Sequence, residues 1–430
     1  MRTLCLLLLE CLLDCSSYAQ DSGFAGSDLI PTENIDGLLY KLNHEGHTAM
    51  LANANCWEGY LSIPEQVAFE SETYIVDRIE WLAFYECSSL TKVRIPKTVS
   101  SIVHYAGFEG CTNPFLGCTS LESIEVDENS PMYMTVDGIL FNKDGTRLYS
   151  YPGGMKADSY TVPGCVKWIG DAFVDNEHLV TLKLPETIEK LYTTFRGCTK
   201  LEKVNLPENM TCLEAGMFDG CLSLKTVKIP SSVTIIGDKA FSGCSSLESI
   251  TLPENINEVG SLVFWNCTSL EEITIPSSLK MISNGMFLGC TNLKNVTIED
   301  GVTAIIMEAF ADCLSLKELL LPASIKSIGV LAFRGCKFDH LIIRGKLSDF
   351  NKHIFDGMDT STTIYTPASQ VKEIQKIYDG VVLPLEDYTG IQPTKCSSGT
   401  PSPSYDPQGR LKGRLSKGLY IQNGRKVMLK

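Results

Sequence analysis

The sequence lacks the features of an integral membrane protein and of a nucleic-acid-binding protein. Its only long apolar run, Leu4–Leu13, is too short to cross a bilayer, which needs about 20 apolar residues. Basic residues are also few, since 37 Lys and Arg stand against 51 Asp and Glu and give a formal net charge of -14. That negative field repels phosphate backbones on average. We therefore expect no transmembrane span and no nucleic-acid partner.

Motifs for catalysis, metal binding and cofactor binding are missing as well. The sequence contains no G-x-S-x-G elbow, no P-loop, no dinucleotide-binding fingerprint and no C-x-x-C pair that would begin a zinc site. The nearest approach is His44-Glu45-Gly46-His47. A zincin places its two histidines four residues apart on a helix, whereas these are three apart. We therefore expect no enzyme activity, no metal and no cofactor.

What the sequence has instead is an internal repeat. Residues 201–338 consist of consecutive 23-residue units. They read LEKVNLPENMTCLEAGMFDGCLS, LKTVKIPSSVTIIGDKAFSGCSS, LESITLPENINEVGSLVFWNCTS, LEEITIPSSLKMISNGMFLGCTN, LKNVTIEDGVTAIIMEAFADCLS and LKELLLPASIKSIGVLAFRGCKF. Seven cysteines share this spacing, namely Cys198, Cys221, Cys244, Cys267, Cys290, Cys313 and Cys336. A fixed period of this length is typical of solenoid proteins.

Each unit follows the pattern L-x-x-I-x-I-P-x-x-V-x-x-I-x-x-x-A-F-x-x-C. The L-x-x-I-x-I part alternates like a short strand with one buried face, and the proline ends it because proline has no N–H to donate. The A-F-x-x-C part turns the chain back with Phe and Cys inward. About seven buried apolar side chains, at roughly 1.5–3 kcal/mol each, do not offset the ordering of a unit at roughly 1.5 kcal/mol per residue. Only stacked units are stable, which predicts a repeat solenoid, a right-handed coil of short parallel strands.

Less regular copies of the unit precede residue 201. They cover 90–131, with a seven-residue insertion, and 160–200, where Asn176 takes the cysteine position. Between them, residues 132–154 depart from the pattern and alternate as two short strands. The turn signal Asn142-Lys143-Asp144-Gly145 lies between these strands, so we expect a β-hairpin insertion.

The units resemble the BspA-like leucine-rich repeats, a treponemal-type branch of the leucine-rich repeat family found in bacterial surface and secreted proteins. The resemblance rests on the unit length, the L-x-x-I-x-I-P strand and endings such as AFSGC (240–244) and AFRGC (332–336), and it covers about residues 34–388. Residues 36–51 look like the strand pair that opens such proteins. Residues 362–387 look like their C-terminal cap, with a strand and a polar helix. The resemblance implies adhesion or ligand binding at the cell surface.

The two ends of the sequence indicate export. Arg2, the apolar run and Ser17-Tyr18-Ala19 match a signal peptide, and lipid anchoring at Cys15 is an alternative. The tail resembles a shortened C-terminal sorting segment of the type IX export route, with a basic β-hairpin as the alternative. The expected segments are a signal peptide (1–19), an N-terminal cap (20–80), leucine-rich repeats (81–360, hairpin insertion 132–154), a C-terminal cap (361–388), a flexible linker (389–404) and the sorting-like tail (405–430).

The repeated cysteines allow three interpretations: disulfides, a metal site, or packing. Equivalent residues of stacked strands lie about 4.8 Å apart, whereas disulfide-linked Cβ atoms lie about 3.8 Å apart. Asn176 and Met358 also occupy the cysteine position, which favours packing as buried small side chains. Pairing remains open for the cysteines outside the repeat position, Cys56, Cys165, Cys212 and Cys396.

The remaining candidate for a functional site is the outer face of the strands. The third and fifth positions of each strand point away from the core, and basic residues gather there in the N-terminal half. Toward the C-terminal end the fifth position becomes aliphatic, at Leu320 and Ile342. We hypothesise that this face binds an acidic or extended partner through Lys92, Arg94, Lys183, Lys203 and Lys228. The alternative is that these residue types merely suit exposed strands.

These observations favour an exported, secreted or cell-surface scaffold that binds a protein, with adhesion to host or matrix proteins as the specific expectation. One alternative is a structural cell-envelope protein without a specific ligand. Another is an enzyme acting on polysaccharide, but Glu272 and Glu318 lie two strands apart, roughly 10 Å by strand spacing, which exceeds the separation that glycosidases use. The sequence leaves the ligand and the oligomeric state open.

Overall fold

The computed structural model describes residues 32–103, 113–348, 350–388, 418–422 and 425–429. The chain separates into two compact units, residues 1–387 and 388–430. The expected signal peptide, the linker and most of the sorting-like tail lie outside the described residues. In the second unit, β30 (Gly418–Gln422) and β31 (Arg425–Leu429) pair antiparallel.

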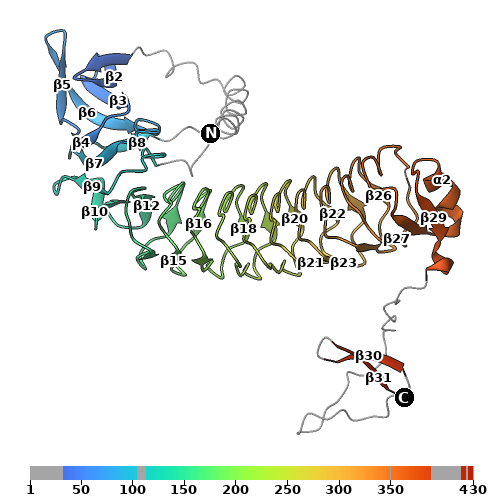
Figure 1. The fold of residues 1–430 in the computed structure, drawn as a ribbon. Helices are drawn as coiled ribbons and strands as arrows, with labels where there is room; N and C mark the ends of the chain where they lie inside the picture. Colours follow the sequence, from blue (N-terminus) through green and yellow to red (C-terminus); the bar gives the residue numbers. More distant parts are fainter. Residues whose placement is uncertain (1–31, 104–112, 349, 389–417, 423–424, 430) are drawn as a thin grey trace, which may run out of the picture. The chain divides into compact units, whose positions relative to one another are not determined.

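The first unit begins with a mixed sheet (Figure 1). Its strand order is β1-β2-β3-β6-β5, and the strands are β1 (Thr32–Ile35), β2 (Leu38–Asn43), β3 (Thr48–Asn53), β5 (Gln66–Phe69) and β6 (Glu72–Glu80). The antiparallel pair β2 and β3 is the strand pair predicted at 36–51. Strand β6 then pairs in parallel with β8 (Ser101–Val103), so the sheet leads directly into the repeats.

Except in the units at 224–229 and 247–252, which form no strand there, the L-x-x-I-x-I segments stack as the parallel strands that the sequence predicts. We call them the first ladder: β4 (Gly59–Ser62), β7 (Leu90–Ile95), β9 (Ser123–Val126), β13 (Ser159–Thr161), β15 (Thr181–Lys183), β17 (Lys203–Val204), β21 (Glu272–Ile275), β23 (Asn295–Ile298), β25 (Glu318–Leu321), β27 (His340–Ile343), β28 (Thr363–Thr366) and β29 (Val381–Pro384). Equivalent residues of neighbouring turns pair, as Glu272 does with Asn295. The coiled repeat predicted from the 23-residue period is confirmed.

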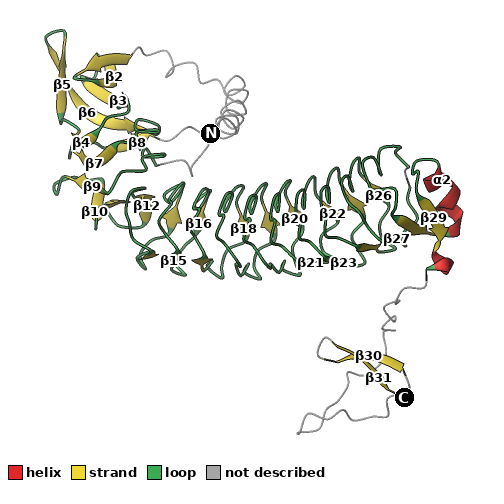
Figure 2. Ribbon diagram, viewed as in Figure 1, coloured by secondary structure: helices red, strands yellow, loops and turns green. Residues whose placement is uncertain are grey.

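The solenoid contains a second set of parallel strands, which the sequence did not predict. Each of these turns contributes one short strand to the set. This second ladder is formed by the V-x-x-I part of each unit: β14 (Trp168–Ile169), β16 (Lys190–Leu191), β18 (Cys212–Leu213), β19 (Ile235–Ile236), β20 (Glu258–Val259), β22 (Met281–Ile282), β24 (Ala304–Ile305) and β26 (Ser327–Ile328). The second residue of each strand is buried and the first faces outward or is half-buried. Most turns therefore have two short strands joined by tight turns. Figure 2 shows helix only near the C-terminal end of the described solenoid.

The insertion at 132–154 is a three-stranded antiparallel meander, one strand more than the predicted hairpin. It consists of β10 (Tyr133–Val136), β11 (Ile139–Asn142) and β12 (Arg147–Ser150). The predicted turn after Asn142 joins β11 to β12. A second turn at Asp137 and Gly138, both with positive φ, joins β10 to β11. Strand β12 pairs in parallel with β14, so the insertion ends as the first strand of the second ladder.

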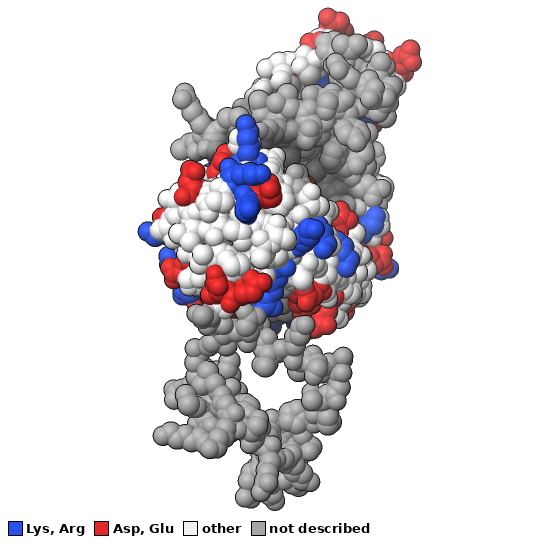
Figure 3. Space-filling view, turned by 90° about the vertical axis from the view of Figure 1, so that its right-hand side faces the viewer, with Lys and Arg blue, Asp and Glu red and all other residues white. Residues whose placement is uncertain are grey.

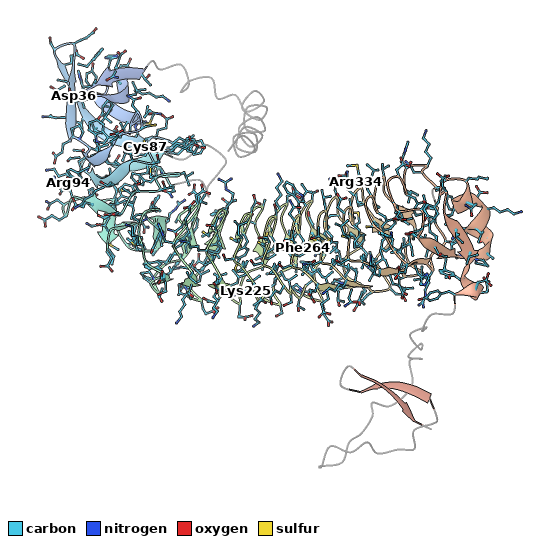
Figure 4. All side chains as sticks on the ribbon, in the orientation of Figure 1. Asp36, Cys87, Arg94, Lys225, Phe264 and Arg334 are labelled. Atoms are coloured by element: carbon cyan, nitrogen blue, oxygen red, sulfur yellow. The ribbon has the colours of Figure 1, made fainter. Side chains whose placement is uncertain are left out.

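The interior of the solenoid contains a column of phenylalanine rings. Adjacent ring centroids lie 5.2 Å to 6.4 Å apart, and most pairs are stacked. The rings belong to Phe173, Phe195, Phe218, Phe241, Phe264, Phe287, Phe310, Phe333 and Phe355. Figure 4 shows Phe264 inside the coil, and Lys225 at its outer edge. Offset aromatic pairs of this kind stabilise neighbouring turns beyond the area that they bury.

A column of cysteines accompanies the phenylalanines. Each thiol donates a hydrogen bond, of 3.0 Å to 3.3 Å, to the backbone carbonyl of the phenylalanine one turn earlier. The donors are Cys118, Cys198, Cys221, Cys244, Cys267, Cys290, Cys313 and Cys336, all of them buried free thiols. This agrees with the packing interpretation and adds a polar role, because the thiol satisfies a buried carbonyl between turns.

The residue before each column cysteine lies in the left-handed region of backbone space. At Gly220, Gly243 and Gly289 φ is between 69° and 75°, and Asn266 and Asp312 take the same conformation. Glycine, asparagine and aspartate adopt this conformation most readily, which explains the recurring G-C, N-C and D-C pairs. The sharp turn directs the cysteine inward.

The C-terminal end of the solenoid is closed by strands β28 and β29 with the short helices η1 (Ala368–Gln370), α2 (Val371–Gln375) and η2 (Leu385–Asp387). The side chain of Gln370 is buried and bonds to the preceding turn, accepting from Leu347 N–H at 2.7 Å and donating to Gly345 C=O at 2.9 Å. Figure 3 looks onto this end, where charged side chains lie mainly around an uncharged central surface. The cap thus covers core that a bare coil would expose.

Candidate functional site

The outer face of the first ladder is an exposed surface that extends over successive turns. Its third-position and fifth-position side chains lie in rows, because the parallel register places Glu272 beside Asn295 and Thr274 beside Thr297. These residues are exposed, while the alternate positions Ile273 and Ile275 are buried. The alternation that predicted one buried face is therefore confirmed for these strands.

Lys92 and Arg94 lie on β7, in a different sheet from Lys183 and Lys203. That sheet, β4-β7-β9, is separated along the chain from β13-β15-β17 by the meander insertion. Lys92 Nζ lies 2.6 Å from the Glu125 carboxylate, and Arg94 donates to Asp127 at 3.0 Å. Both cations are thus paired with carboxylates of the next turn, which reduces the field that they offer to a partner.

Lys183, Lys203 and Lys228 lie on three successive turns and are exposed. Lys228 forms an ion pair with Glu208. Among the described residues, neither Lys183 nor Lys203 takes part in an ion pair. The structure therefore brings three of the five basic candidates together and leaves two of them with unpaired charge.

The centre of the same face carries a shallow hollow that the sequence analysis did not identify. It has a volume of about 330 Å³ and is lined by Ser249, Thr251, Glu254, Glu272, Thr274, Asn295, Thr297 and Glu299, with buried isoleucines beneath. Small Ser and Thr side chains in the third and fifth rows leave this space between longer carboxylate side chains. The run of Ser and Thr at those positions in units 247–315 was the available signal.

The hollow has acidic groups on three turns. Glu254 follows the segment 247–252, Glu272 lies on β21, and Glu299 follows β23. The Glu299 carboxylate accepts a hydrogen bond from Ser277 N–H at 2.9 Å, which holds it at the edge of the face. Along the coil the face thus changes from basic, at Lys183 to Lys228, to acidic in the hollow.

At the C-terminal end of the face, the prediction of an exposed aliphatic row is wrong. Ile342 is fully buried and Leu320 is half-buried. The register places Ile342 between Leu320 and Tyr365, and β28 and β29 continue the sheet beyond it. Large flanking side chains remove its exposure, whereas the Thr residues of the preceding turns have no such neighbours.

The two histidines of the N-terminal cap flank the β2–β3 turn and surround Tyr74. The Tyr74 hydroxyl donates to Glu72 at 2.7 Å and lies 2.7 Å from His44 Nδ1, while the His47 ring is tilted against the tyrosine ring, with centroids 5.8 Å apart. The hydrogen bond to Glu72 raises the pKa of Tyr74 to about 12. Across the described residues, no three His, Cys, Asp or Glu side chains are arranged to hold a metal ion.

A coil with two parallel ladders, an inward Phe and Cys in each regular turn and caps at both ends defines a leucine-rich repeat protein. The model of the BspA type leucine rich repeat region matches the chain in six copies, over residues 77–132, 167–294 and 280–378. These matches cover more than half of the sequence. The chain belongs to the BspA-type leucine-rich repeat family.

The chain is also similar to several solved structures. A leucine-rich repeat protein from Bacteroides ovatus is 21% identical, with a TM-score of 0.40, over 81% of this chain and 98% of that one. A leucine rich cell surface protein from Faecalibacterium prausnitzii is 22% identical, with a TM-score of 0.44, over 83% and 100%. The pneumococcal vaccine antigen PcpA is 15% identical, with a TM-score of 0.33, over 83% and 99%. Among curated proteins, no match was found.

None of the helices in the described part of the chain has the length and apolar character needed to cross a bilayer.

Proposed function

We propose that the protein is an exported, surface-associated scaffold that binds another protein through the outer face of the first ladder. The observation that carries the proposal is the exposed face itself, with Lys183 and Lys203 outside any ion pair and an acidic hollow further along. Two unneutralised positive charges in adjacent turns do not stabilise the fold. A partner with carboxylates in the corresponding places would stabilise them.

The face has a basic region and an acidic region, which constrains the charges that a partner must carry. Acidic groups of the partner would contact Lys183, Lys203 and Lys228, and a basic group would contact Glu254, Glu272 and Glu299 in the hollow. Turns repeat at about 4.8 Å, so an extended segment lying along the coil could contact both regions. Adhesion to host or matrix proteins is the specific form of this proposal.

The test is charge reversal on the face. The variant Lys183→Glu/Lys203→Glu/Lys228→Glu should weaken binding to immobilised matrix proteins at least tenfold, measured by surface plasmon resonance. A matched control, Lys326→Glu/Lys352→Glu/Lys372→Glu, changes the net charge equally at exposed sites away from the first ladder and should bind like wild type. Reversal of the ion-paired Lys92 and Arg94 should have a smaller effect.

Unchanged binding by the face variant would remove Lys183, Lys203 and Lys228 from the binding site. No binding of the wild type to any matrix protein, together with its recovery in the envelope fraction, would favour the structural alternative. Cell fractionation with sequencing of the mature N-terminus tests export separately.

A further inference from the structure

The cysteine column has an unusual N-terminal end. Cys87 is buried and follows Phe84, as each column cysteine follows its phenylalanine. The turn before it, at residues 54–59, stacks directly on the turn of Cys87: Ala54 N–H donates to Ala83 C=O at 2.7 Å, and Gly59 N–H donates to Ser89 C=O at 2.9 Å. Residue 56 therefore lies against residues 86 and 87.

Cys56 occupies the left-handed position of this turn, with φ of 53°, where Gly220 and Gly243 stand in later turns. This conformation costs a residue with a Cβ roughly 1–2 kcal/mol, so a cysteine is a poor choice for the turn alone. Its side chain is exposed. The Cys56 thiol lies near enough to Cys87 to raise the pKa of the Cys87 thiol.

The placement of Cys56 relative to Cys87 differs from that of neighbouring cysteines in the column. Column cysteines are in register, about one strand spacing apart, and their thiols are directed to phenylalanine carbonyls. Cys56 is offset by one residue from the column position, since its turn aligns Ala54 with Phe84. The offset places Cys56 diagonally across from Cys87 on the adjoining turn.

We propose that Cys56 and Cys87 form a disulfide that fastens the N-terminal cap to the first repeat turn. With a small-molecule disulfide such as oxidised glutathione as oxidant, the Cys56 thiolate attacks one sulfur and displaces one glutathione thiolate. The Cys87 thiolate then attacks the Cys56 sulfur and displaces the second. The two protons pass to the released glutathione thiolates, so two cysteine thiols are oxidised and one glutathione disulfide is reduced.

The order of these steps follows from exposure. Burial raises the pKa of the Cys87 thiol, and the nearby Cys56 thiol raises it further. The accessible Cys56 is therefore the thiol that meets the oxidant, and Cys87 resolves the mixed disulfide. Closing the chain between residues 56 and 87 restricts the unfolded state of the cap.

The experiment uses the purified full-length protein. Reduced protein is incubated with oxidised glutathione at pH 8, quenched with acid, alkylated in denaturant and analysed by peptide mass spectrometry. We expect a linked pair of peptides containing Cys56 and Cys87, two hydrogen masses lighter than the sum of its parts and released by reductant. The variant Cys56→Ser should leave Cys87 alkylated, and the control Cys165→Ser, at another exposed thiol, should keep the link.

Two results would overturn the proposal. One is glutathione retained on Cys56 with Cys87 alkylated, and the other is Cys56 linked to a different cysteine. A second readout is the thermal midpoint, which oxidation should raise in the wild type and leave unchanged in Cys56→Ser.

Discussion

At the scale of single residues, the turns repeat because a few positions have strict backbone and polar requirements. The A-F-x-x-C ending predicted inward Phe and Cys, and both are buried in every regular unit. It did not predict the hydrogen bond of each thiol, because that bond joins a side chain to a carbonyl in another turn. Two such positions lead to predictions.

The first concerns a column thiol. Replacing Cys267 with alanine removes its hydrogen bond to Phe241 C=O and leaves a small cavity, so the free energy of unfolding should fall by about 1–2 kcal/mol. Urea denaturation measures the change. The control Cys165→Ala alters an exposed thiol and should stay within about 0.5 kcal/mol of wild type. Equal losses in the two variants would contradict the role of the column.

The second concerns the left-handed position two residues before each phenylalanine. Gly216 and Gly285 occupy it in two units, but Lys239 occupies it in another, with φ of 55°. Lys239→Gly relieves the steric conflict of its Cβ and should raise the free energy of unfolding by about 0.5–1 kcal/mol. The reverse change, Gly216→Lys, should lower it by a similar amount. A loss of stability in Lys239→Gly would show that its side-chain contacts outweigh the backbone strain.

At the scale of elements, the sequence predicted the first ladder and missed the second. Strands such as β21 cover four residues, so their alternation is visible, whereas β22 covers only Met281 and Ile282 and has no readable period. The exposure of the outer face was predicted correctly where small side chains repeat. It was not predicted at Ile342, whose burial depends on Tyr365 in the C-terminal cap.

The phenylalanine column gives a prediction at this scale. Phe264 stacks on Phe241 and Phe287, with centroids 5.6 Å away on each side. Phe264→Ala removes both contacts and leaves a buried cavity, so it should cost about 3–5 kcal/mol of unfolding free energy. Phe264→Leu, which fills more of the space, should cost less. Hydrogen exchange should increase first in the turns on either side of residue 264, and a uniform increase along the coil would contradict local coupling between turns.

At the scale of the whole molecule, the cysteine column is a line of buried ionisable groups. Burial raises the pKa of every column thiol from Cys198 to Cys313, and that of Cys290 to about 12. The folded protein therefore keeps these protons at pH values where the unfolded chain, with thiols near the ordinary value of 9.0, releases them. The neutral column stabilises the fold fully below about pH 9 and progressively less above it.

The sign of this linkage predicts alkaline unfolding. Above pH 9 the unfolded state binds fewer protons than the folded state, so the free energy of unfolding falls as pH rises. Each thiol that stays protonated only in the fold contributes a slope of about 1.4 kcal/mol per pH unit up to its folded pKa. Urea denaturation with reductant at pH 7, 9 and 10 measures the slope, and Cys290→Ala should make it shallower by one such contribution. A stability that is constant from pH 7 to 10, or rapid reaction of the native column with a thiol reagent, would show that the thiols are not held protonated by burial.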